Sequence, residues 1–90
     1  MAMSVVWLKF DEASVGQKLQ EAMEKLDGEN EVILDFSSVR RIDSGALRVM
    51  EDFVGTADGK GIKIVLQSVS VDIYKVLKLL KLAPRFIFSN

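Results

Sequence analysis

Segments typical of strands alternate with segments typical of helices along this chain, and this alternation constrains the fold more than any other feature. Short runs rich in β-branched and aromatic residues occupy positions 5–10, 31–36, 62–66 and 85–88. Between them, apolar residues recur at helical spacing over 15–26, 43–59 and 70–82. Because right-handed crossovers return successive strands to the same sheet, this order predicts an α/β fold with a mostly parallel central β-sheet and helices packed against it. A length of 90 residues predicts a single domain over 1–90.

The run Glu31–Phe36 is apolar without a clear alternation of apolar and polar residues. Such runs are typical of strands that helices cover on both faces. We therefore expect this strand to lie in the middle of the sheet with helices on both sides.

Composition excludes several kinds of chemistry. The chain has no Cys and no His, which removes disulfides, thiol nucleophiles, the usual zinc ligands and the imidazole base of a serine triad. We predict that the protein is not an enzyme and uses no metal or cofactor. A net charge of −1 lacks the basic excess of nucleic-acid-binding proteins. No apolar run approaches the roughly 20 residues that span a bilayer, so we expect no direct membrane insertion and a cytoplasmic location.

The connection from Val39 to Leu47 holds the most unusual polar residues of the chain. It joins the predicted central strand to a helix start, which is where parallel sheets bind ligands and partners. Ser44 falls in the first helical turn, where free backbone amides favour a phosphate. Phosphorylation would add about −1.5 to −2 charges beside Asp43 and near Arg40 and Arg41. In the alternative interpretation, Asp43 or Ser44 only caps the helix, because both are common N-cap types.

Three other features allow a functional and a structural interpretation. Asp11 and Asp35 end strands and could hold a metal or a ribose, although acidic residues there are more often solvated caps. The stripe formed by Lys75, Lys78 and Lys81 would suit anionic lipid or an acidic partner, or is simply a solvated helix face. The aromatic residues Trp7, Phe86 and Phe88 belong to the core or to edge strands. An exposed aromatic edge would indicate pairing with another chain, and a homodimer is one alternative.

Three segments of the chain together resemble the STAS domain family, which includes the anti-sigma factor antagonists. They are Val32–Phe36, the hexapeptide Ile42-Asp43-Ser44-Gly45-Ala46-Leu47, and Gly61–Leu66. In that family a hydrophobic strand ends in an acidic residue, and an Asp-Ser-(Ser/Thr/Ala)-Gly-Leu segment opens the next helix. Gly45-Ala46 departs from this pattern, and only one predicted strand precedes the first helix.

The resemblance implies a protein that takes part in transcription regulation by partner switching. It places the phosphoacceptor at Ser44, which an anti-sigma factor serine kinase would modify and a phosphatase would reset. It also implies a partner-binding surface made of Arg40, Arg41, Asp43, Gly45, Ala46, Arg48 and Asp11. An alternative within the family is an accessory subunit of a lipid-transport ABC ATPase or of a stress-signalling complex, in which Ser44 is a helix cap. A third hypothesis, an enzyme or nucleotide-binding module, would use Asp11, Asp35 and Asp43 with a divalent ion.

Overall fold

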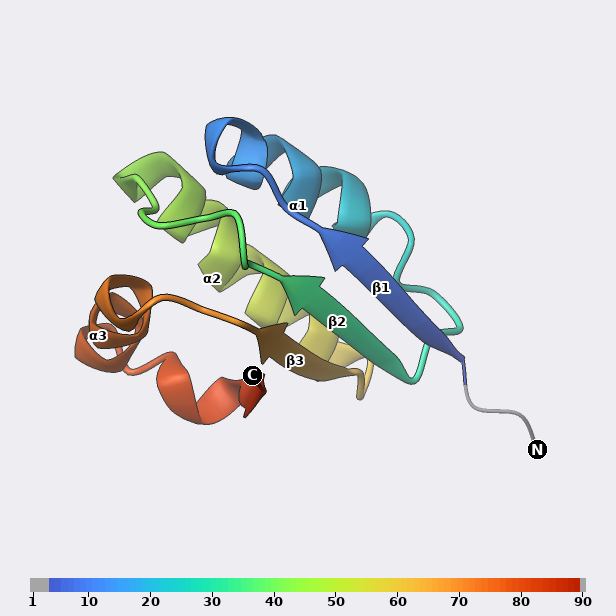
Figure 1. Cartoon of the computed structure of the whole chain (residues 1–90). Coiled ribbons are helices and arrows are strands. Elements are labelled where there is room, and N and C mark those ends of the chain that lie inside the picture. Colours follow the sequence, from blue (N-terminus) through green and yellow to red (C-terminus); the bar gives the residue numbers. More distant parts are fainter. Residues whose placement is uncertain (1–3, 90) are drawn as a thin grey trace.

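The fold has the predicted alternation of strands and helices. A computed structural model of the chain describes residues 4–89 and is shown in Figure 1. Its elements are β1 (Val5–Lys9), a 3-10 turn η1 (Glu12–Ser14), α1 (Val15–Met23), β2 (Glu31–Asp35), α2 (Ser44–Gly59), β3 (Lys63–Gln67), α3 (Val71–Leu79), a 3-10 turn η2 (Ala83–Arg85) and β4 (Ile87–Ser89). The α/β class with helices packed against a parallel sheet is therefore confirmed.

The four strands form one parallel sheet in the order β1-β2-β3-β4. The register places Trp7, Ile33, Val65 and Ile87 side by side in one row across the sheet. β2 lies inside the sheet, as predicted. Because all strands run the same way, the loops that follow β1, β2 and β3 emerge at the same edge.

The core lies between one face of the sheet and the helices. Figure 1 shows α1 and α2 side by side along one side of the sheet, with α3 beyond β3. The buried side chains of the strands on this face belong to Val32, Leu34, Ile64 and Leu66. They form one cluster with buried residues of all three helices, among them Leu19, Met50, Phe53, Ile73 and Leu77. The three helices thus share a single core on one side of the sheet.

The prediction that helices cover β2 on both faces is wrong. Burial alternates along β2: Val32 and Leu34 are buried, whereas Glu31, Ile33 and Asp35 on the opposite face are only partly buried. β1 alternates in the same way, and its outward residues Val5 and Trp7 are 49% and 54% exposed. Side chains of successive strand residues point to opposite faces. The sheet therefore has one covered face and one open face.

Candidate functional site

The β2–α2 loop, residues 36–43, is the centre of the candidate site because it leads directly to the start of α2. Two apolar side chains, those of Phe36 and Val39, are buried and hold the loop against the core. The Asp35 carboxylate accepts a hydrogen bond of 2.9 Å from the Ser37 amide, and this bond lowers the pKa of Asp35. The loop is thus a fixed turn.

Neighbouring elements hold this loop from both sides through the backbone of Arg40. The Glu12 carboxylate, just after β1, accepts hydrogen bonds from the amides of Arg40 (2.7 Å) and Arg41 (3.0 Å). The Ser70 hydroxyl, before α3, donates to the Arg40 carbonyl at 3.0 Å and also accepts from the Ile73 amide, which caps α3. The two backbone amides lower the pKa of the Glu12 carboxyl from its ordinary value of 4.5. Three successive loops at the same sheet edge are therefore tied together.

Asp43 caps α2. Its backbone is extended, and its carboxylate accepts a hydrogen bond of 2.7 Å from the Ala46 amide. Ser44 is the first helical residue and is exposed, and its hydroxyl makes no hydrogen bond within residues 4–89. The interpretation of Ser44 as the helix cap is therefore wrong, because Asp43 already fills that position. The Ser44 hydroxyl is displayed at the amino end of a helix of 16 residues.

Ala46, which the family resemblance placed in the partner-binding surface, is largely buried in the first turn of α2. Only 7% of it is exposed, and it faces Gly16 near the start of α1. A Cβ at Gly16 would lie 3.5 Å from the Ala46 Cα and 3.7 Å from the Ala46 Cβ, which is ordinary packing distance, so the starts of α1 and α2 lie close together here. Beside this contact, a groove of about 490 Å³ opens between the starts of α1 and α2, with Glu12, Gln17, Asp43 and Gly45 on its walls.

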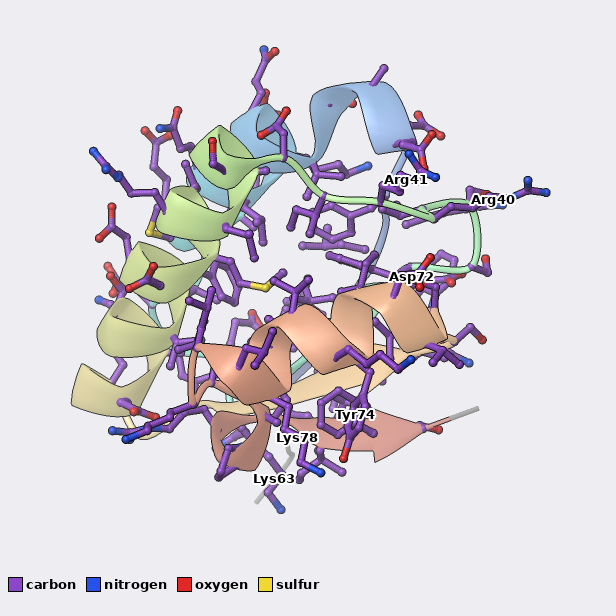
Figure 2. The ribbon with its side chains drawn as sticks, turned by 90° about the vertical axis from the view of Figure 1, so that its left-hand side faces the viewer. Arg40, Arg41, Lys63, Asp72, Tyr74 and Lys78 are labelled. Carbon is purple, nitrogen blue, oxygen red and sulfur yellow. The ribbon has the colours of Figure 1, made fainter. Side chains whose placement is uncertain are left out.

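The remaining residues of the predicted surface are all exposed. Arg48 lies one helical turn after Ser44, where an i, i+4 pair can meet. In Figure 2, the side chain of Arg40 extends outward at the far end of the loop from the start of α2. Arg48 is therefore better placed than Arg40 to approach a charged group on Ser44. Asp11 is exposed at the end of β1, next to Glu12.

Glu12 and Ser70 are the residues that the sequence interpretation missed. Both act on the backbone of the loop that contains the predicted surface. Ser70 caps α3, and nothing in the sequence near it signals its second bond, to the Arg40 carbonyl. Glu12 has no sequence signal of its own, because its partners lie 28 and 29 positions away.

The acidic residues that were considered as metal ligands have other roles or stand apart. Asp35 holds the turn at Ser37 and Asp43 caps α2. Among residues 4–89, no group of three or more His, Cys, Asp or Glu side chains is placed to hold a metal ion. In the same part of the chain, no helix has both the length and the apolar character needed to cross a membrane.

Replacing Asp43 by alanine is expected to destabilise the protein by about 1 kcal/mol, the usual cost of losing an N-cap side chain. Ser44→Ala is the matched control and is expected to change stability by less than about 0.5 kcal/mol, as exposed substitutions usually do. Urea unfolding of the two variants measures both values. Equal losses, or a larger loss for Ser44→Ala, would contradict the assignment of the cap to Asp43.

Acidification is expected to release Glu12 from the β2–α2 loop. Because the folded pKa lies below 4.5, the carboxylate contributes stability above about pH 4.5, and this contribution is lost as the pH falls through the folded pKa. The amide chemical shifts of Arg40 and Arg41, followed by NMR from pH 7 to pH 3, should move together with a midpoint below 4.5. Glu12→Gln should abolish this transition, whereas Glu21→Gln, an exposed change on α1, should leave it in place. A midpoint above 4.5 in the unaltered protein would contradict the assignment.

Comparisons with known proteins agree with the architecture. The sequence model of the STAS domain family matches residues 9–90. A crystal structure of a proposed anti-sigma factor antagonist from Thermotoga maritima superposes with a TM-score of 0.77 at 23% identity, covering 96% of this chain and 79% of that one. A sulfate transporter family protein from Wolinella succinogenes superposes with a TM-score of 0.79 at 17% identity, covering 98% of this chain and 80% of that one.

A comparison with curated proteins gives no match. At these identities the two structures establish the fold alone. The family match covers nearly the whole chain and includes the Asp43-Ser44 helix start, the loop before it and the strands β2, β3 and β4. On this evidence, the chain belongs to the STAS domain family.

Proposed function

We propose that the protein is a cytoplasmic binding module of the anti-sigma factor antagonist type, controlled by phosphorylation of Ser44. In this proposal its partners are a serine kinase that is also an anti-sigma factor, and a phosphatase. The unphosphorylated form binds the kinase and frees the sigma factor. The protein itself catalyses no reaction and acts in transcription regulation and signal transduction through its partners.

The observation that carries this proposal is the free hydroxyl of Ser44 at the amino end of α2. Asp43 supplies the cap, so modification of Ser44 removes no hydrogen bond of the fold. A helix amino end also favours negative charge, because its first amides lack partners within the helix. A phosphate on Ser44 could therefore form without unfolding the domain.

A rigid surface around Ser44 is the second support. Glu12 and Ser70 hold the loop before α2 by hydrogen bonds, and α2 lies close to α1 at Gly16 and Ala46. A phosphate adds about −1.5 to −2 charges to this surface, next to the Asp43 carboxylate. Such a change can repel a docked partner through charge alone, because like charges brought together at an interface cost several kcal/mol.

Incubation with the cognate kinase and ATP, followed by mass spectrometry of the digested protein, tests the proposal. One phosphate should appear on Ser44, and Ser44→Ala should remove it. Ser37 and Ser38 on the loop before α2 are the internal comparison because they are also exposed. A phosphate confined to either of them would end the proposal.

The groove between the starts of α1 and α2 favours a second candidate function, an accessory subunit of a transport ATPase or of a stress-signalling complex. This groove is formed without any modification of Ser44 and could seat a partner constitutively. Under this candidate, the affinity for the partner is the same for the unaltered protein and for Ser44→Asp. The two proposals therefore give opposite results when Ser44 is given a negative charge.

A further inference from the structure

The open face of the sheet carries an apolar row that no helix covers. The row consists of one residue from each strand, placed side by side by the strand register: Trp7, Ile33, Val65 and Ile87. At the two edges of the sheet, Trp7 and Ile87 are 54% and 48% exposed. In the interior strands Ile33 is half-buried and Val65 is 9% exposed. None of the four belongs to the cluster that forms the core.

A side-chain hydrogen bond holds the centre of this row in place. The indole Nε1 of Trp7 on β1 donates to the Oε1 of Gln67 on β3 at 3.1 Å. The indole must therefore extend across β2, over the part of the face that contains Ile33. An aromatic ring fixed in this way presents a preformed apolar surface and loses little side-chain freedom on binding.

Charged and polar residues flank the apolar row on both sides. Glu31 and Lys63 lie next to each other in the row nearer the amino ends of the strands. The other flanking row contains Lys9, Asp35, Gln67 and Ser89. The Lys63 side chain points away from the helices, as Figure 2 shows. Neither Glu31 nor Lys63 forms an ion pair with another residue in the part of the chain that the structure describes.

We propose that the open face binds the open face of a second copy of this chain, with a two-fold axis that runs parallel to the strands between β2 and β3. This rotation places β2 of one copy opposite β3 of the other and leaves each row opposite itself. Ile33 and the Trp7 indole that extends over β2 then lie opposite Val65 of the second copy, and β1 lies opposite β4 of the second copy. Glu31 of each copy faces Lys63 of the other copy, so the dimer contains two such pairs of opposite charge.

The charges select this axis over the other symmetric arrangement. A two-fold axis along the apolar row would reverse the strands and exchange the two flanking rows. Glu31 would then face Asp35 of the second copy, and like charges directly opposite each other are destabilising. With the axis along the strands, Asp35 faces Gln67 and Lys9 faces Ser89, so no like charges meet. Two twisted sheets stacked in this way can adopt the aligned packing of β-sandwiches.

The size of the face indicates a weak dimer. Four strands about 4.8 Å apart, with five residues rising about 3.3 Å each, make a face of roughly 300 Å² per copy. The area that each copy would bury is below the roughly 800 Å² per partner of a standard stable interface, even though protruding side chains add to the flat area of the face. We expect a dissociation constant on the order of 100 µM, so that assembly depends on local concentration.

Sedimentation equilibrium from 5 µM to 1 mM tests the proposal. The unaltered protein should convert from monomer to dimer over this range, and its only Trp should change fluorescence in parallel. Glu31→Lys and Lys63→Glu should each weaken association at least tenfold, because each places like charges opposite each other twice. An equimolar mixture of the two variants should recover association, because every facing pair in the mixed dimer is then Lys against Glu.

The mixture separates the proposed contact from an effect on folding, since a destabilised monomer would not be rescued by the other variant. Lys25→Glu, an exposed charge reversal on the turn after α1, should leave the association unchanged. A protein that stays monomeric at 1 mM would overturn the proposal. So would a dimer that both face variants leave intact, or a mixture that associates no better than either variant alone. Phosphorylation of Ser44 is not involved, so this result is independent of the proposed switch.

Discussion

Replacing Ser44 by aspartate is expected to weaken binding of the protein partner by about 100-fold. The carboxylate would stand on the first turn of α2 beside the exposed carboxylate of Asp43, at the centre of the surface proposed to dock the kinase. Bringing negative charge into such an interface costs several kcal/mol, and about 2.7 kcal/mol corresponds to 100-fold in affinity. A phosphate carries more charge than aspartate and should have a larger effect.

Affinity is best measured with the partner that the unphosphorylated protein captures from its host, purified and titrated by calorimetry. Ser44→Ala should bind as the unaltered protein does, because the hydroxyl makes no hydrogen bond that holds the fold. Asn30→Asp adds one negative charge at the opposite edge of the sheet and should leave binding unchanged. An aspartate at this position can still accept the hydrogen bond that the Ser4 amide donates to Asn30. Equal affinities for Ser44→Asp and Ser44→Ala would favour the constitutive accessory subunit over the switch.

The start of α2 could be predicted from sequence because its signals are local. An aspartate followed by a serine and a run of apolar residues at helical spacing places the first turn, and it leaves the cap to either Asp43 or Ser44. Ala46 shares a helix face with the buried residues Met50, Phe53 and Ala57, although the family resemblance had placed it in the partner-binding surface. The family motif directed attention to the neighbours of Ser44 in sequence, and helical phase separates them into exposed and buried positions.

One residue, Ile33, explains why the open face of the sheet was not predicted from the sequence. Ile33 stands between Glu31 and Asp35 on the outward face of β2, and its apolar side chain makes the run resemble a strand buried on both sides. What covers Ile33 is partly the indole of Trp7, which comes from another strand. Contacts of this kind, like that of Glu12 with the loop amides, depend on which strands are neighbours and in which register. Composition and periodicity do not contain that information.

Phe36 connects the stability of the core to the geometry of the site. Its side chain is fully buried and packs on the ring of Phe10 with the centroids 5.0 Å apart. Its amide donates to the carbonyl of Gln67 at 2.9 Å, and its carbonyl accepts from the amide of Val39 at 2.9 Å. One residue thus joins the ends of three strands to the loop that leads to Ser44.

Phe36→Ala is expected to lower the free energy of unfolding by about 3–5 kcal/mol, because it removes a buried ring and leaves a cavity that the surrounding strands cannot fill. Domains of this size are stable by only about 5–15 kcal/mol, so the loss is a large part of the total. Guanidinium unfolding should show a lower midpoint with an unchanged slope, since the surface exposed on unfolding changes little. Phe36→Leu should lose less stability, because most of the side-chain volume remains.

Trp7→Ala, measured at 5 µM where the protein is expected to be monomeric, is the control for removing an aromatic ring that lies outside the core. A loss for Phe36→Ala no greater than that for Trp7→Ala would show that the sheet edge beneath the loop is not the tightly packed support on which the display of Ser44 depends.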